Sequence, residues 1–78
     1  MIDKSFATIL KRLRVEKGLS QEKFGFEADL HRTYVSQLER GLKSPSLKTL
    51  HKIATVLEIS LTELMALVEQ ESNVPSGQ

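Results

Sequence analysis

Residues 32–40 carry polar side chains at a spacing suited to reading the edges of nucleic-acid bases. At about 100° per residue on a helical wheel, one arc holds hydrogen-bond donors and no carboxylate. These residues are Arg32, Thr33, Ser36, Gln37 and Arg40. Arg can bond a guanine edge through two donors, and Gln can bond adenine in the same way. A solvated amphipathic helix has the same pattern, so the wheel alone leaves the function open.

The short connection before this segment favours the nucleic-acid interpretation. Ser20 is a good N-cap, and we expect it to start a helix that runs to Ala28. Only three or four residues then separate this helix from the next one, which begins near Arg32. Two helices joined so tightly cross steeply, as in a helix-turn-helix, and small Gly25 allows their close approach. The N-terminal half of the second helix would then reach deepest into the major groove.

Three further helices are predicted from apolar spacing and capping signals. One spans about residues 4–17 and ends at Gly18, a residue suited to the left-handed conformation after a helix. Another starts at Ser44-Pro45, with Pro45 in the first helical position and Leu47 in its apolar stripe. A third begins at Ser60 with a Ser-x-x-Glu capping box.

These segments predict an all-α fold of five helices. No stretch shows the alternation of a half-buried strand. We expect residues 1–70 to form one domain that binds DNA and dimerises. Residues 71–78 contain Pro, Gly and polar residues, and we expect them to form a disordered tail.

Charge is distributed unevenly along the chain. Residues 1–52 contain all eleven Lys and Arg residues and six acidic residues, which gives a net charge of +5. Residues 53–78 contain four Glu residues and no basic residue, which gives −4. A positive front half and a negative back half are expected of a protein that turns one side toward phosphate.

Several classes of protein are disfavoured by what the sequence lacks. There is no cysteine, which suits a cytoplasmic protein and excludes disulfides and thiolate metal sites. No apolar run approaches the roughly 20 residues of a membrane span. The two histidines, His31 and His51, form no metal-binding motif, and we expect His31 to act as a helix cap or a phosphate neighbour. No catalytic triad or phosphate loop is evident, so we expect neither an enzyme nor a cofactor or small-molecule ligand.

Residues 21–41 also resemble a known family. The positions that match its helix-turn-helix are Gln21, Phe24, Gly25, Leu30, Val35, Leu38 and the Glu-Arg-Gly run at 39–41. They resemble the phage repressor and Cro-type (XRE-like) regulators, and the likeness extends over about residues 5–68. The short length and the HisArgThrTyrValSer run at 31–36 further resemble the controller proteins of restriction–modification systems.

The resemblance implies a five-helix repressor-like fold that binds double-stranded DNA as a homodimer, and it implies roles for individual residues. The positions expected to read bases are Arg32, Thr33, Ser36 and Gln37. Those expected to touch the DNA backbone are Gln21, for which helix capping is the alternative, Arg40, Lys43 and Ser44. We also expect Tyr34 to pack its ring and to offer its hydroxyl to a phosphate. Arg14 and Glu39 match the family's partly buried ion pair.

The sequence departs from the family pattern at two positions. Asp29 occupies the turn position that usually holds Gly, and Asp tolerates the left-handed conformation better than most residues. Gly25 replaces the usual Ala, which should weaken that helix by roughly 1 kcal/mol.

The C-terminal helix carries more apolar residues than a lone small core needs, with no basic residue nearby. We expect a two-fold dimer interface there, formed by Ile59, Leu61, Leu64, Met65 and Val68. These residues could instead belong to the monomer core. A protein-interaction module, such as an antitoxin that covers a toxin with this helix, is the alternative function. RNA binding is disfavoured, because Tyr34 is the single candidate for aromatic stacking.

Overall fold

The computed structural model describes residues 2–73, and this range contains five α-helices and no strand. The helices are α1 (Ile2–Glu16), α2 (Gln21–Ala28), α3 (Arg32–Glu39), α4 (Leu47–Leu57) and α5 (Leu61–Ser72). The predicted all-α, five-helix fold is therefore confirmed. Helix α5 continues through Ser72, so residues 71 and 72, which the sequence assigned to the tail, are helical. The rest of the predicted tail, residues 74–78, lies outside the described residues.

Serine side chains begin three of the helices. The Ser20 hydroxyl accepts the Lys23 N–H at the start of α2, as predicted. At α5, the Ser60 hydroxyl accepts the Glu63 N–H, and the Glu63 carboxylate accepts the Ser60 N–H at 2.9 Å, which confirms the capping box.

The predicted start of α4 is wrong by two residues. Ser46, not Ser44, is the N-cap, and its hydroxyl accepts the Thr49 N–H at 3.1 Å. Pro45 therefore precedes the cap instead of occupying the first helical position. The Ser44 hydroxyl donates instead to the Asp3 carboxylate of α1. Leu47 is 71% exposed, so the packed apolar stripe of α4 begins later, at Leu50.

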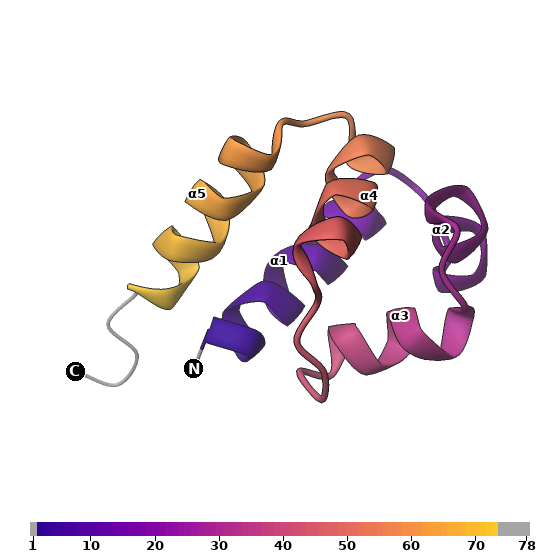
Figure 1. The fold of residues 1–78 in the computed structure, drawn as a ribbon, viewed down its shortest axis with the longest axis horizontal. Coiled ribbons are helices and arrows are strands. Elements are labelled where there is room, and N and C mark those ends of the chain that lie inside the picture. Colours follow the sequence, from indigo (N-terminus) through magenta and orange to yellow (C-terminus); the bar gives the residue numbers. More distant parts are fainter. Residues whose placement is uncertain (1, 74–78) are drawn as a thin grey trace.

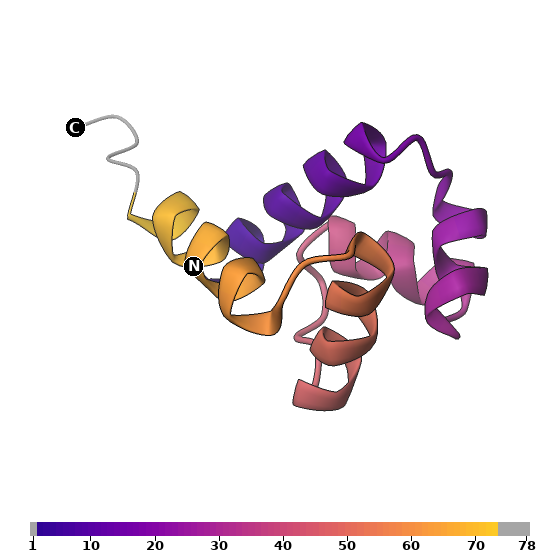
Figure 2. The same ribbon diagram turned by 90° about the horizontal axis from the view of Figure 1, so that it is seen from above.

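The hydrophobic core lies where α1 meets the other helices. Helix α1 packs against α5 along one side and against α3 along another, and α2 packs against both α3 and α4. In both views α5 and α2 lie at opposite ends of the molecule (Figures 1 and 2). The largest fully buried side chains are Phe24, Ile9, Leu10, Leu38, Ile53, Leu64 and Val35. Because Val35 and Leu38 belong to this core, their packing fixes the position of α3.

Two residues expected at a dimer interface belong to this core instead. Leu64 is 0% exposed and Val68 is 3% exposed within a single chain. Both lie on the side of α5 that packs against α1 and α4, and only a small part of Val68 reaches the surface, in a groove beside Met65. The prediction for these two residues is corrected, and Ile59, Leu61 and Met65 remain as half-buried candidates.

No helix within residues 2–73 is both long and apolar enough to cross a lipid bilayer.

Candidate nucleic-acid interface

A three-residue turn joins α2 to α3, and its backbone is fixed by hydrogen bonds. Asp29 adopts the left-handed conformation with φ 57°, as expected for the position after a helix. The Leu30 N–H donates to the Gly25 carbonyl at 2.7 Å, and the Asp29 N–H donates to the Phe26 carbonyl. These bonds satisfy carbonyls that the end of α2 would otherwise leave unpaired.

Gly25 makes the tight turn possible. A Cβ atom at this position would lie 2.6 Å from the Leu30 carbonyl oxygen and 3.4 Å from a Val35 methyl. The first distance is shorter than a carbon–oxygen contact allows, so a larger residue would force the turn to shift. The glycine that lowers the helix propensity of α2 therefore lets the turn and α3 approach it.

Helix α3 separates its apolar and polar residues as the wheel predicted. Val35 and Leu38 are fully buried, whereas Arg32 and Thr33 are exposed. The other two predicted base-reading residues, Ser36 and Gln37, are half-buried, as is Tyr34. Arg32 and Thr33 lie in the first turn of α3, and Gln37 lies one turn beyond Thr33. The structure thus brings the four residues to one helix, on the side away from the core.

The N-cap of α3 differs in kind from the other caps. The Nδ1 atom of His31 accepts the backbone N–H of Thr33 at 3.1 Å. His31 itself has an extended backbone and an exposed side chain. Its predicted role as a cap is confirmed.

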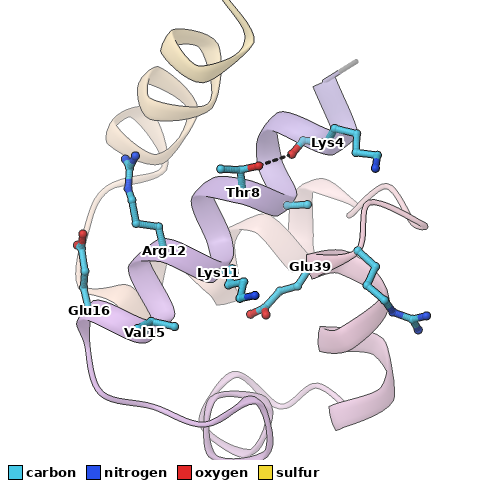
Figure 3. Close-up of a pocket in the computed structure, with 9 residues that line it drawn as sticks. Lys4, Thr8, Lys11, Arg12, Val15, Glu16 and Glu39 are labelled. Atoms are coloured by element: carbon cyan, nitrogen blue, oxygen red, sulfur yellow. Dashed lines mark hydrogen bonds between the residues drawn. The ribbon is translucent and has the colours of Figure 1, made fainter. Parts of the chain in front are cut away.

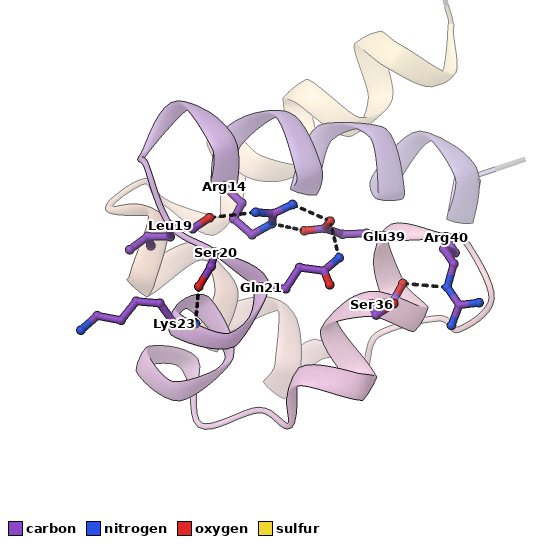
Figure 4. Close-up of polar contacts among 8 residues, drawn as sticks. All are labelled: Arg14, Leu19, Ser20, Gln21, Lys23, Ser36, Glu39 and Arg40. Atoms are coloured by element: carbon purple, nitrogen blue, oxygen red, sulfur yellow. Dashed lines mark hydrogen bonds and ion pairs between the residues drawn. The ribbon is translucent and has the colours of Figure 1, made fainter.

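A polar network braces α3 against α1 and α2 (Figure 4). The Nε and Nη2 atoms of Arg14 donate to the Glu39 carboxylate, and Nη1 donates to the Leu19 carbonyl at 2.8 Å. The Gln21 side-chain amide donates to the same carboxylate at 3.0 Å. The Arg14 and Glu39 side chains are 11% and 3% exposed, so the predicted partly buried ion pair is present. Its hydrogen bond with Glu39 raises the pKa of the Arg14 guanidinium above its ordinary value.

The loop after α3 carries three residues expected to touch the DNA backbone. Arg40 is exposed, and its Nε donates back to the Ser36 carbonyl at 3.4 Å (Figure 4). Lys43 is exposed as well. Ser44 differs, because its hydroxyl donates to both Asp3 carboxylate oxygens at 2.7 Å. A carboxylate at this point repels phosphate, which argues against a backbone contact by Ser44.

A groove of about 630 Å³ lies between α1 and the end of α3 (Figure 3). Basic residues from both helices line it, namely Lys4, Lys11, Arg12 and Arg40, together with acidic Glu16 and Glu39. The Lys4 side chain also lies over Gly41. A Cβ atom built on Gly41 would be 3.2 Å from the Cδ atom of Lys4. Sequence reasoning missed Lys4 and Lys11, because only the packing of α1 on α3 brings them beside Arg40.

The described residues offer no metal site. Within residues 2–73, no three His, Cys, Asp or Glu side chains are grouped so that they could hold a metal ion.

Comparison with known proteins assigns the family. The family described as helix-turn-helix matches residues 10–64, which include α2, the turn and α3. The chain belongs to the helix-turn-helix family. The resemblance seen in residues 21–41 is thereby confirmed.

Curated members of this helix-turn-helix family include two similar control proteins. The control protein C.MunI of a Mycoplasma species is 48% identical over 67 residues, which cover 85% of this chain and 90% of that protein. The control protein C.BamHI of Bacillus amyloliquefaciens is 41% identical over 61 residues, which cover 77% of this chain and 75% of that protein. Both agree with the likeness to restriction–modification controllers.

Solved structures share the five-helix fold. The wild-type restriction–modification controller protein C.Esp1396I is 29% identical, with a TM-score of 0.83 over 92% of this chain and 94% of that one. The same controller as a tetramer with its natural 35-base-pair operator matches with a TM-score of 0.82 at 30% identity, over 91% and 93% of the two chains. A helix-turn-helix chain of this fold is therefore known in complex with operator DNA.

Proposed function

We propose that this chain is a sequence-specific double-stranded DNA-binding transcriptional regulator that inserts α3 into the major groove. The observation that carries the proposal is the first turn of α3, where Arg32 and Thr33 are exposed on a helix fixed by a buried face. Arg32, Thr33, Ser36 and Gln37 would read bases, because their donors match the hydrogen-bonding groups of base edges. This role involves no catalysis, and we expect the protein to act in the cytoplasm.

The proposed backbone contacts surround this helix. Arg40 and Lys43 are exposed cations at its C-terminal end, and Tyr34 has a hydroxyl that can reach a phosphate from a half-buried ring. Gln21 begins α2, where free backbone N–H groups attract phosphate. Its side-chain amide is already bonded to Glu39, which fixes its direction. We leave Ser44 out of the contact set because of its bond to Asp3.

We propose a homodimer in which a two-fold axis passes near α5. Ile59, Leu61 and Met65 are half-buried apolar residues of the α4–α5 loop and of α5, and α5 lies at the opposite end of the molecule from α2 (Figure 1). A largely apolar groove of about 400 Å³ lies near this surface, and Asp3, Ser44 and Glu69 line it together with the apolar residues Ile2, Phe6, Pro45, Leu50, Met65 and Val68. Two copies related in this way would place their α3 helices on successive turns of the operator, about 34 Å apart.

The biological role we propose is control of a restriction–modification system. It is supported by the control proteins C.MunI and C.BamHI and by the controller–operator complex. The alternative is a protein-interaction module, such as an antitoxin, that uses the apolar residues of α5. This alternative predicts a heteromeric partner at the same surface.

The test is binding to the DNA upstream of the protein's own gene, against scrambled DNA of equal length, near physiological salt. We expect strong preference for the upstream DNA and a steep loss of affinity as salt increases, because released counterions drive phosphate binding. Equal, weak binding to both DNAs would contradict autoregulation and favour the partner-binding alternative.

A further inference from the structure

We propose that His31 positions the DNA-reading turn of α3 as a neutral N-cap, so that specific DNA binding weakens as acidification protonates it. The inference rests on the proposed function, since it concerns how the same helix is held. Its structural basis is one hydrogen bond, from the Thr33 backbone N–H to His31 Nδ1 at 3.1 Å.

This hydrogen bond defines the protonation state of the ring. An imidazole nitrogen accepts a hydrogen bond only when it carries no proton, so this cap requires the neutral ring with its proton on Nε2. The cationic form of the ring carries a proton on both nitrogens and cannot accept the Thr33 N–H. Protonation therefore removes the cap of α3.

Protonation also places a charge where a helix disfavours it. The N-terminus of a helix is the positive end of its dipole, so a cation there is unfavourable. Arg32 already brings one positive charge to the first turn of α3. At the turn, the Asp29 carboxylate pairs with Lys52 of α4, with 3.6 Å between Oδ2 and Nζ, and Glu27 of α2 and His51 of α4 line the same pocket as this pair.

The hydroxyl groups that cap α2, α4 and α5 do not titrate near neutral pH. Ser20, Ser46 and Ser60 begin α2, α4 and α5 through hydroxyl oxygens, which do not titrate in the physiological range. Histidine is the side chain that ordinarily changes charge between about pH 5 and pH 8. Of these four caps, only the one on the DNA-reading helix is titratable.

Two of the four predicted base readers, Arg32 and Thr33, follow His31 directly in the chain. Thr33 supplies the N–H that His31 accepts, and Arg32 lies between them in the chain. When the cap is lost, the first turn frays, and the two side chains must be ordered again on binding. Loss of an N-cap weakens helix formation by about three- to tenfold, and we expect a similar factor in specific DNA affinity.

The test compares three proteins that all carry His51→Gln to remove the second histidine: one that keeps His31, one with His31→Asn and one with His31→Ala. Asn is a strong N-cap that does not titrate, whereas Ala cannot cap. Affinity for the preferred upstream DNA is measured by fluorescence anisotropy from about pH 8 to pH 5.5 at constant ionic strength. Scrambled DNA is the control for general charge effects.

We expect the His31 protein and His31→Asn to bind within about twofold of each other near pH 8, and His31→Ala to bind about fivefold more weakly. On acidification, the affinity of the His31 protein should fall toward that of His31→Ala, whereas His31→Asn should stay constant. Identical pH profiles of the His31 protein and His31→Asn would overturn the proposal. Tighter binding of the His31 protein at low pH would also overturn it, since the cation would then act as a phosphate contact.

A measurement without DNA separates this inference from the proposed function. The ¹⁵N shifts of the His31 ring should show an unprotonated Nδ1 near neutral pH, and the Thr33 amide shift should titrate together with the ring. A proton on Nδ1, or a Thr33 amide that is insensitive to the ring, would overturn the inference. Failure of the proposed function appears differently, as the absence of DNA preference in every variant at every pH.

Discussion

The Arg14 guanidinium holds the Glu39 carboxylate through two nitrogens, Nε and Nη2, and so ties α1 to the last residue of α3. The Gln21 amide joins the same carboxylate from the first residue of α2. One carboxylate therefore sets the distance between three helices. The two ends of the helix-turn-helix unit are held at this point, because Gln21 begins α2 and Glu39 ends α3.

We expect Arg14→Met to lower the free energy of unfolding by about 3–5 kcal/mol, because it leaves the buried Glu39 carboxylate without its charged partner. The double variant Arg14→Met/Glu39→Leu should recover most of this loss, since no uncompensated charge remains. The measurement is urea unfolding followed by circular dichroism. Lys17→Met, which removes the exposed Lys17–Glu58 pair, is the matched control and should cost less than about 1 kcal/mol.

The pH dependence of this ion pair follows from the raised pKa of Arg14. A group with a raised pKa in the folded state contributes stability below its unfolded pKa and loses it only as the pH rises through the folded value. Arg14 titrates at high pH in both states. The stability difference between wild type and Arg14→Met should therefore not change through deprotonation of Arg14 in the neutral range.

We expect Gly25→Ala to lower stability by about 1–3 kcal/mol, because its Cβ would overlap the Leu30 carbonyl oxygen in the turn. This cost should exceed the gain of about 1 kcal/mol in helix propensity that alanine brings. Thermal unfolding measures the effect. Gly18→Ala is the informative comparison, because a Cβ there meets nothing within 4 Å and only the positive φ of 76° is strained. A Gly25→Ala protein more stable than wild type would contradict this prediction and would show that the turn can shift at little energetic cost.

Local signals explain which parts of the fold were predictable from the sequence. Ser20 and Ser60 cap their helices because the hydroxyl oxygen and the N–H that donates to it are only three residues apart. Asp29 adopts the left-handed conformation for an equally local reason. At α4 two serines flank Pro45, and both satisfy the same rule. The structure has Ser46 as the cap, while the Ser44 hydroxyl donates to Asp3, 41 residues away, a contact that no local rule could predict.

The assignment of apolar residues in α5 was less predictable for the same reason. Leu64 and Met65 are neighbours with similar hydrophobicity, yet Leu64 is fully buried and Met65 is half-buried. The difference depends on where α1 lies, and the spacing of apolar residues within α5 cannot show this. Likewise, Lys4 and Lys11 join the surroundings of Arg40 only through the packing of α1 on α3.

We expect Glu58→Gly to raise the free energy of unfolding by about 1 kcal/mol, because Glu58 has a left-handed backbone with φ 60° after α4. The lost ion pair with Lys17 offsets little of this gain, since the Glu58 side chain is 77% exposed. Glu58→Asn should give a smaller gain, because Asn tolerates this conformation better than Glu but less well than Gly. Urea unfolding of wild type and the two variants gives their free energies of unfolding. A loss of stability in Glu58→Gly would show that the left-handed backbone at Glu58 is not strained.

We expect Arg32→Ala to weaken binding to the preferred upstream DNA by about 1–3 kcal/mol and to change binding to scrambled DNA little. Lys43→Ala should instead weaken both by similar amounts and lower the slope of log affinity against log salt by about one. Titrations of both DNAs at several salt concentrations distinguish the two behaviours. Equal losses of Arg32→Ala on both DNAs would place Arg32 on the backbone instead of on a base.

The last prediction concerns the dimer. Met65 is half-buried in one chain and lines the apolar groove between α1, α4 and α5. In the proposed homodimer, Met65→Glu would bury an unpaired carboxylate, which is costly, so we expect the variant to be monomeric. We also expect it to lose affinity for a two-fold operator, because one chain can occupy only one half-site.

Sedimentation equilibrium of the two proteins measures the change in mass, and circular dichroism checks that the variant is folded. Phe26→Glu is the matched control, because Phe26 is 80% exposed on α2, at the other end of the molecule from α5. The control should have the same oligomeric state as wild type, since the dimer leaves α2 free. A folded Met65→Glu protein that remains dimeric would exclude this surface and move the two-fold axis elsewhere. A wild-type monomer would favour the alternative in which α5 binds a different protein.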